Sequence, residues 1–333
     1  MTTLQSGPVR RINLALQGGG SHGAFTWGVL DRLLEEESIV VDGISGASAG
    51  AMNAVVYADG MQDGGAAGAK KALHDFWKAV SDMPNIGELE IPSLMQFAGA
   101  GLDLLSRMFS PSEINPLNIN PLRDMLNAQI DFARLRQHSP VKLFICATNV
   151  KSGRVRVFDN AELSCDVLLA SSCLPFAFQA AEVNGEYFWD GGYMGNPPLF
   201  PLFEQTATRD IMIVQVNPIE RDEVPDTSLE IIDRLNEISF NTPLMLELRG
   251  IDLVNRMLAK NLADASQYQP LYIHAVDAES QMRQFSASSK SDSAWAFLQK
   301  LHQIGRQAAD KWLVENLDAI GKRSSVDIAK KYL

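Results

Sequence analysis

Apolar residues recur along the chain with two different periods. Short apolar stretches bounded by glycine, proline or asparagine predict β-strands, at residues 11–17, 39–45, 141–149, 155–158, 180–183, 211–216 and 271–276. Apolar residues three and four positions apart predict helices instead, at about residues 23–36, 49–58, 227–262 and 293–319. Because strands and helices alternate, we expect an α/β fold with a largely parallel sheet. No internal repeat or low-complexity linker divides the chain, which favours one domain over two.

Residues 83–121 interrupt this alternation. They contain five prolines and the apolar stretch 94–102, and a connection of this length is usually functional or mobile. Two interpretations stay open. The segment is either a partly buried loop with one ordinary amphipathic helix, or a cap or lid whose apolar residues within 91–111 close over a substrate groove.

The balance of charge argues against one class of partner. The 333 residues include 29 Lys and Arg against 40 Asp and Glu, a formal net charge of −11, whereas nucleic-acid-binding proteins carry a basic surface. Anionic lipid surfaces should not attract the chain either, so contact with a membrane or micelle is expected to be local, apolar and transient. No run of eighteen apolar residues predicts a membrane span, and the N-terminal residues lack the apolar segment of a signal peptide. The expected location is the cytoplasm, with room for a peripheral association with membranes.

The three cysteines, Cys146, Cys165 and Cys173, form no CxxC pair. An odd number without such a pair argues against a disulfide framework and a zinc site, and it suits a reducing compartment. The histidines and carboxylates form no HExxH or similar arrangement, so no metal is expected.

A glycine-rich loop, residues 18–23, lies between the first predicted strand and the first predicted helix. Glycines at such a junction let several backbone N–H groups point toward one anion, and the helix N-terminus adds its positive end. That anion can be a phosphate or the oxyanion formed during acyl transfer. The spacing Gly18-x-Gly20-x-x-Gly23 also fits a dinucleotide-binding loop, with Asp42 at a suitable distance for a ribose contact. Taken alone, the loop supports phosphate, nucleotide and oxyanion binding equally.

A second motif distinguishes these interpretations. Gly46-Ala47-Ser48-Ala49-Gly50 is a GxSxG sequence between a predicted strand and a predicted helix, which is the setting of a nucleophilic serine on a sharp turn. The two glycines let the strand and the helix approach each other closely. A dinucleotide-binding fold has no use for such a serine, whereas acyl transfer needs both a nucleophile and an anion-binding loop.

These two motifs, within the first fifty residues, and a later Asp190-Gly191-Gly192 together resemble the patatin-like phospholipase family. The resemblance covers about residues 10–220, and residues 221–333 are expected to be mainly helical and to pack on the same domain. It implies a three-layer α/β/α sandwich with a mainly parallel central sheet. It also implies a serine acyl hydrolase that cleaves fatty-acyl esters of lipids without a cofactor.

The resemblance assigns roles to individual residues. It implies Ser48 as the nucleophile, Asp190 as its base, and an oxyanion hole formed by the amides of Gly18, Gly19 and Gly20. An aspartate near its reference pKa of roughly 3.9 accepts a serine proton poorly. We therefore expect Asp190 to be at least partly buried by the aromatic residues that precede it, Tyr187, Phe188 and Trp189.

His22 departs from the family pattern, because the family usually has Arg or Lys at this position. The cation behind the glycine loop is then either missing or partly replaced by a protonated imidazole, and we expect His22→Arg to be tolerated. Other mechanisms stay open at this point. A Ser-Asp-His esterase could use His274 or His302, a serine acyltransferase of related fold could use His138, and the glycine loop could belong to a nucleotide-binding module.

Overall fold

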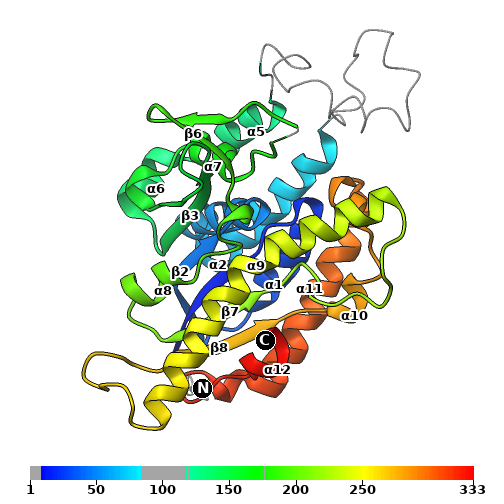
Figure 1. Ribbon diagram of the computed structural model, residues 1–333. Helices are drawn as coiled ribbons and strands as arrows, with labels where there is room; N and C mark the ends of the chain where they lie inside the picture. The colour runs from blue at the N-terminus through cyan, green and yellow to red at the C-terminus, as the bar shows by residue number, and fades with distance from the viewer. Residues whose placement is uncertain (1–8, 84–117, 119, 176) are drawn as a thin grey trace.

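The computed structural model describes residues 9–83, 118, 120–175 and 177–333 (Figure 1). Within them, one sheet has the strand order β5-β6-β3-β2-β1-β7-β8, and β4 pairs with β3. The strands are β1 (Arg10–Leu16), β2 (Ile39–Gly46), β3 (Lys142–Asn149), β4 (Val155–Phe158), β5 (Ala181–Val183), β6 (Glu186–Asp190), β7 (Asp210–Val214) and β8 (Tyr272–Val276). All strands lie within two residues of the predicted stretches, apart from β6, which was not predicted.

The sheet is mainly parallel, as predicted. Strands β3, β2, β1, β7 and β8 run in the same direction. Strands β4 and β6 each pair with β3 in the antiparallel sense, and β5 pairs antiparallel with β6 at the edge of the sheet. Strand β8 comes from the C-terminal third of the chain and pairs with β7. The C-terminal third therefore extends the same sheet as well as contributing helices.

Helices connect the strands and cover them. None of those described is long and apolar enough to cross a membrane. The α-helices are α1 (Gly23–Leu33), α2 (Ala49–Asp82), α5 (Pro121–Gln129), α6 (Phe132–His138), α7 (Cys165–Ser171), α8 (Phe200–Gln205), α9 (Ser228–Ala259), α10 (Glu279–Met282), α11 (Trp295–Asn316) and α12 (Ile328–Tyr332). Short 3-10 helices are η1 (Gly20–His22), η2 (Asn160–Glu162), η3 (Gly191–Tyr193), η4 (Ala287–Ser291) and η5 (Leu317–Ala319).

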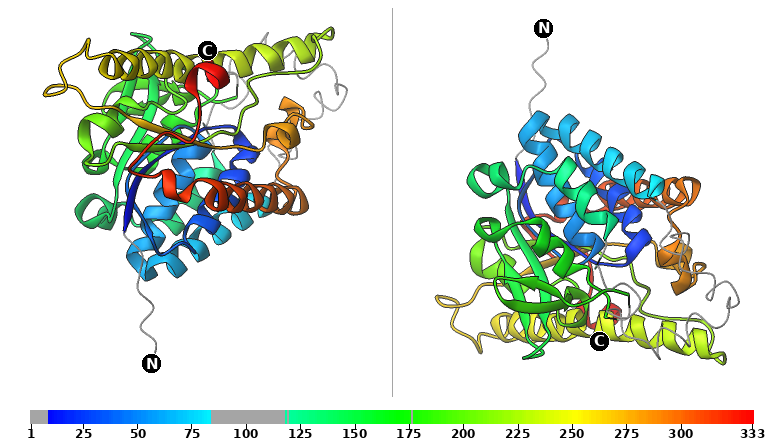
Figure 2. Two further views of the ribbon diagram at one scale, coloured as in Figure 1. Left: turned by 90° about the horizontal axis from the view of Figure 1, so that it is seen from below. Right: turned by 90° about the horizontal axis from the view of Figure 1, so that it is seen from above.

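The helices form a layer on each face of the sheet (Figure 2). On one face, α1, α2, α7 and α11 bury side chains such as Phe25, Leu168 and Leu301 in a shared core. On the other face, α8, α9 and α12 bury Leu202, Leu248 and Ile328 among others. The fold is therefore a three-layer α/β/α sandwich, which confirms the predicted class.

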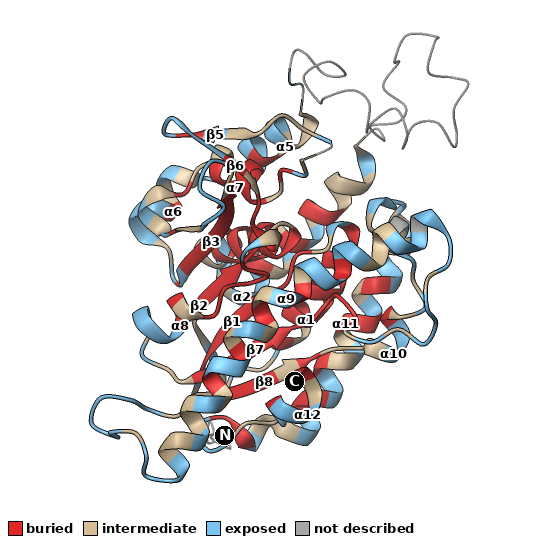
Figure 3. Cartoon of the chain, viewed as in Figure 1, coloured by how far each residue is buried: buried red, intermediate tan, exposed pale blue. Residues whose placement is uncertain are grey.

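Burial on both faces explains why the strands could be predicted. Successive side chains of a strand point to opposite faces: Leu14 and Leu16 of β1 join the core beneath α1, whereas Ala15 between them joins the core beneath α9. A strand covered on both faces is apolar almost throughout. Figure 3 shows the central strands as largely buried.

The second helix is longer than predicted. The pattern indicated residues 49–58, but α2 continues to Asp82, with non-helical backbone at Gly64 and Gly65. These two glycines separate an N-terminal half buried beside the sheet from a more exposed C-terminal half. The glycine-rich middle of the helix has no clear apolar period, and so the pattern did not extend across it.

The predicted cap, residues 83–121, lies almost entirely outside the described residues, which resume at Asn118 and Asn120 before α5. Whether residues 91–111 act as a lid therefore stays a prediction from the sequence.

Candidate active site

Ser48 occupies the sharp turn between β2 and α2. Its backbone has φ 53° and ψ −124°, a conformation that residues other than glycine rarely adopt. Ser48 is also the N-cap residue of α2. A Cβ atom at Gly50 would overlap the carbonyl oxygen of Leu16, and one at Gly46 would overlap the backbone of Gly50. Both glycines are therefore required by the close approach of strand and helix, in the setting that the sequence predicted.

Asp190 ends β6 and begins η3. Its side chain is 1% exposed, and one carboxylate oxygen accepts a hydrogen bond from the backbone N–H of Gly192 at 2.7 Å. A Cβ atom would overlap Cys146 if added at Gly191 and the Phe240 ring if added at Gly192. The two glycines thus allow the turn that holds the carboxylate in place.

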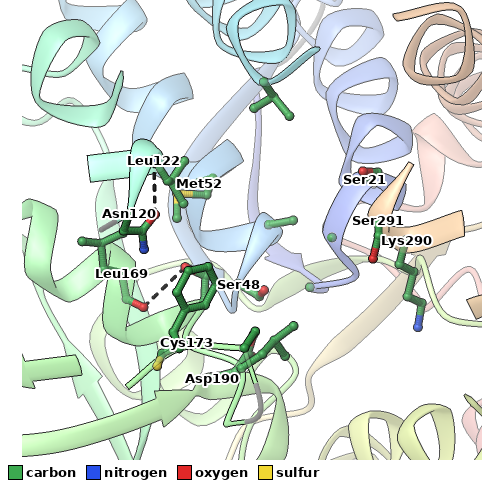
Figure 4. Close-up of a pocket in the computed structure, with 18 of the residues that line it drawn as sticks. Ser21, Ser48, Met52, Asn120, Leu122, Leu169, Cys173, Asp190, Lys290 and Ser291 are labelled. Atoms are coloured by element: carbon green, nitrogen blue, oxygen red, sulfur yellow. Dashed lines mark hydrogen bonds between the residues drawn. The ribbon is translucent and has the colours of Figure 1, made fainter. Parts of the chain in front are cut away.

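The register of the sheet brings Ser48 and Asp190 to the same level. Gly46, two residues before Ser48, pairs with Ile145 of β3. Asp190 pairs with Ala147, two residues further along the same strand. Because β2 and β6 flank β3 on opposite sides, the serine and the aspartate reach one cavity from the two sides of that strand (Figure 4).

Burial makes Asp190 a stronger base than an ordinary aspartate. Desolvation raises the pKa of its carboxyl group to about 6, although the Gly192 N–H, the Ser48 hydroxyl and the charge of Lys290 each act to lower it. The preceding aromatic residues supply only part of this burial, because Tyr187 is 39% exposed while Phe188 is buried. The buried position of the carboxylate at the end of β6 therefore supplies the basicity that serine activation requires.

The glycine loop lies directly against Ser48. A Cβ atom at Gly18 would come within 2.7 Å of the Ser48 Cβ atom. The Gly18 N–H, however, donates to Asn196 Oδ1 at 2.7 Å inside the protein. The expectation that Gly18 contributes an oxyanion donor is therefore corrected, and Gly19 and Gly20 remain as candidates.

Two asparagines that the sequence did not single out hold this loop. Asn196 accepts the Gly18 N–H, and Asn217 donates through Nδ2 to the Gly18 carbonyl oxygen at 2.8 Å. Gln17 also contributes, since its side-chain oxygen accepts the N–H groups of Val216 and Asn217. Asn196 follows the Asp-Gly-Gly motif by four residues and could have been suspected, whereas no local signal marks Asn217.

The family model for patatin-like phospholipases matches residues 14–203, which include the glycine loop, Ser48, Asp190 and Asn196. The chain belongs to the patatin-like phospholipase family. Lipid ester hydrolysis is accordingly the activity that the family assignment supports.

Two curated relatives match more distantly. Both are named lysophospholipase NTE1, from two strains of Cryptococcus neoformans var. neoformans serotype D, and each is 27% identical over 216 residues. The match covers 63% of this chain and 11% of the relative, so the chain spans only a small part of the relatives' length.

Two solved structures are also similar. VipD from Legionella pneumophila has 17% identity and a TM-score of 0.39, over 89% of this chain and 67% of that one. The heterodimeric ExoU–SpcU complex from the type III secretion system of Pseudomonas aeruginosa has 20% identity and a TM-score of 0.31, over 97% and 65%.

His22, the departure from the patatin-like pattern, is buried and neutral. The Ser289 hydroxyl donates to the Ser286 carbonyl oxygen at 2.6 Å, so it accepts the hydrogen of His22 Nε2 at 2.7 Å. His22 Nδ1 has no hydrogen-bond partner among the described residues. Burial, with the charges of Lys290 and Arg221, lowers the pKa of His22 to about 3. Of the two alternatives left open by the sequence, the low pKa of His22 favours the one in which the glycine loop itself carries no cation.

The other histidines do not line the cavity that contains Ser48. His274 is fully buried against Asp210, with 2.9 Å between Nε2 and Oδ1. His302 packs on the Trp27 ring, with 3.9 Å between ring centroids, and His138 ends α6. A Ser-Asp-His triad and a Ser-His pair thus find no support in the arrangement.

Asp42 weakens the nucleotide-binding alternative. Asp42 lies in the middle of β2, between Val41, which pairs with Ile12 of β1, and Gly43, which pairs with Asn13 of β1. The glycine loop, in contrast, follows the carboxyl end of β1. The Asp42 carboxylate instead accepts from Arg11 at 3.3 Å and from the Ala207 N–H at 3.0 Å. A ribose bound at the loop would be out of its reach.

The cavity has a volume of about 1700 Å³, which exceeds the roughly 300–1,000 Å³ of pockets that hold drug-sized ligands. Ser48 and Asp190 lie at one place on its wall, beside the glycine loop (Figure 4). Much of the remaining lining is apolar, from Met52, Phe76, Trp77, Leu169, Leu174, Phe178 and Phe240. The cavity therefore has the size and polarity to receive a long acyl chain next to the serine hydroxyl.

Proposed function

We propose that this protein is a serine acyl hydrolase that cleaves fatty-acyl esters of phospholipids, lysophospholipids or related lipids. The observation that carries the proposal is the meeting of a strained serine and a fully buried aspartate of raised pKa in one large apolar cavity. Family membership supports the same chemistry. The name of the curated relatives favours a lipid with one remaining acyl chain as a first substrate to test.

In the proposed mechanism, Asp190 accepts the Ser48 proton while Ser48 Oγ attacks the ester carbonyl carbon. The backbone N–H groups of Gly19 and Gly20 stabilise the oxyanion, helped by the positive end of α1. The bond to the leaving alcohol breaks and the alcohol takes the proton from Asp190. Water then gives a proton to Asp190 and attacks the acyl-enzyme, which releases the fatty acid and restores the Ser48 hydroxyl. No cofactor takes part in these steps.

An acyltransferase would differ only in the final acceptor, an alcohol in place of water. Asp190 would activate either acceptor in the same way, and we favour water because the chain belongs to a family of phospholipases. Product analysis with and without added alcohol acceptors distinguishes the two activities.

We further propose that the enzyme acts in the cytoplasm and meets lipid surfaces only transiently. Its three cysteines are free and buried, which suits a reducing compartment. Its net charge of −11 opposes adsorption to anionic membranes and binding to nucleic acid.

Release of fatty acid from lysophospholipid and from a soluble chromogenic ester tests the proposal. Ser48→Ala and Asp190→Asn should each abolish turnover. Ser239→Ala and Asp252→Asn, at two residues of α9 that do not line the cavity, serve as matched controls and should retain it. Full turnover in Ser48→Ala would contradict the proposal.

A further inference from the structure

The outer side of the glycine loop is covered by η4, a segment of the C-terminal third. The Lys290 carbonyl oxygen packs against Gly20 so closely that a Cβ atom there would overlap it. One residue earlier, Ser289 accepts the hydrogen bond from His22. Both residues lie well beyond residues 14–203, where the family model matches. The loop is therefore completed by a part of the chain that carries no family motif.

The Lys290 side chain connects to the main chain of the loop through one amide. Its Nζ donates to Asn217 Oδ1 at 2.7 Å, and Asn217 Nδ2 donates to the Gly18 carbonyl oxygen at 2.8 Å. Hydrogen bonds in such a chain polarise one another, most strongly in a buried setting. The positive charge is thus transmitted toward the peptide unit formed by the Gly18 carbonyl group and the Gly19 N–H group.

Several charged groups face the Lys290 ammonium. Burial, together with the charge of Arg221, lowers the pKa of Lys290, while Glu237, Asp233 and Asp190 act in the opposite sense and favour its charged form. Glu237 is itself shared between Arg221 and Arg234, with 3.1 Å to the latter. Because His22 is neutral, no residue of the loop itself carries a positive charge.

We propose that Lys290 is a positioning residue of the active site, which holds the glycine loop through Asn217 and places a positive charge behind the oxyanion hole. This inference rests on the proposed acyl-hydrolase function. In the transition state the carbonyl oxygen becomes negative, and a fixed cation behind the donors stabilises that charge more than it stabilises the neutral ester. The same cation favours the ionised form of Asp190, which is the form that accepts the Ser48 proton.

Three substitutions separate the charge from packing. Lys290→Met removes the charge and the hydrogen bond, Lys290→Gln retains an amide donor without the charge, and Lys290→Arg retains the charge. Lys300→Met is the matched control, because Lys300 is exposed and lies over the Phe285 ring at 5.0 Å. The measurement is the pH profile of kcat/KM, with kcat and KM taken separately, on a short soluble ester.

We expect Lys290→Met and Lys290→Gln to lower kcat about tenfold or more, with KM within about twofold. The acid limb of the profile, where kcat/KM falls toward low pH, should move to higher pH in both variants, since loss of the cation raises the pKa of Asp190. Lys290→Arg should restore much of kcat and return the limb toward its original position, and Lys300→Met should match the unchanged enzyme. If Lys290→Met does not fold, the position of the acid limb in Lys290→Gln alone tests the inference.

An unchanged acid limb in a folded Lys290→Gln or Lys290→Met enzyme would overturn the inference, as would a Lys290→Arg enzyme no better than Lys290→Met. Failure of the proposed function itself is distinguishable, because it would appear as turnover that persists in Ser48→Ala. Inactivity of Ser48→Ala together with an unshifted Lys290→Gln profile rejects only the role of Lys290.

Discussion

Asp190 and Ser48 lie 142 residues apart in the sequence, yet β6 and β2 place them at the same level on the two sides of β3. The aspartate arrives on an antiparallel strand and the serine on a parallel one. Burial raises the pKa of the aspartate to about 6, and the serine hydroxyl is close enough to lower it in turn. This relationship gives the proposed mechanism both its nucleophile and its base.

The first prediction concerns the pH at which activity is lost in acid. Asp190 must be ionised to accept the Ser48 proton, so kcat/KM on a soluble ester should fall with a midpoint near pH 6, where the buried carboxyl titrates. An ordinary aspartate would place the midpoint near 3.9.

A histidine base could give a similar midpoint, and His302→Ala is therefore the control. This variant should retain the acid limb and most of the turnover, since His302 packs on Trp27 outside the cavity. If the fall in activity at acid pH disappears in His302→Ala, His302 and not Asp190 would be the base.

The second prediction concerns the oxyanion donors. Gly19→Ala should lower kcat by about two orders of magnitude with little change in KM, because the new Cβ would meet Val216 at 3.0 Å and displace the loop. Gly250→Ala, on an open face of α9 with nothing within 4 Å, should leave kcat unchanged. Steady-state kinetics on both variants give the comparison, and equal kcat values would contradict the expected displacement of the loop.

The third prediction concerns His22→Arg, which the family pattern alone suggests should be tolerated. The structure indicates the opposite, because the guanidinium would be buried between the Phe285 and Phe297 rings, near the positive charges of Lys290 and Arg221. The nearby carboxylate, Glu237, is already shared between Arg221 and Arg234, so the added buried charge should lower the free energy of unfolding by about 3 kcal/mol or more. Urea unfolding measures this, with His74→Arg on the exposed face of α2 as control, and a stable, active His22→Arg enzyme would contradict the prediction.

The fourth prediction concerns stability and pH. Glu247 of α9 accepts the N–H groups of Leu199 and Phe200, both at 2.9 Å, and burial raises its pKa from 4.5 to about 7. The folded state holds this proton more tightly than the unfolded state does. The contribution of Glu247 to the free energy of unfolding is therefore complete below about pH 4.5 and is lost as the pH rises through 7. The raised pKa of Asp190 acts in the same sense.

Urea unfolding at pH 5 and pH 7.5 therefore should show lower stability at the higher pH, by about 2 kcal/mol from Glu247. Glu247→Gln keeps an oxygen acceptor for the two N–H groups and should remove this part of the difference. A difference that is unchanged in Glu247→Gln would assign the pH dependence to other groups.

Local patterns were sufficient for much of the fold. The continuous apolar runs of the buried strands and the strand–turn–helix context around Ser48 could be predicted from short stretches of sequence. The length of α2 could not, because Gly64 and Gly65 interrupt its apolar period.

The environment of the site depends on distant pairings that no local pattern contains. The Gly18 N–H is taken by Asn196, 178 residues away, and Lys290 reaches the loop only after the C-terminal third has packed on the sheet. The neutral state of His22 likewise follows from burial by residues more than 260 positions later, including Ser289.

Reaction with a fluorophosphonate probe, located by tandem mass spectrometry, tests the central claim most directly because it needs no knowledge of the natural lipid. The account predicts one phosphonyl adduct, on Ser48, which forms more slowly in Asp190→Asn and is absent from Ser48→Ala. An adduct on a different serine, or labelling of Ser48→Ala at the rate of the unchanged protein, would contradict it.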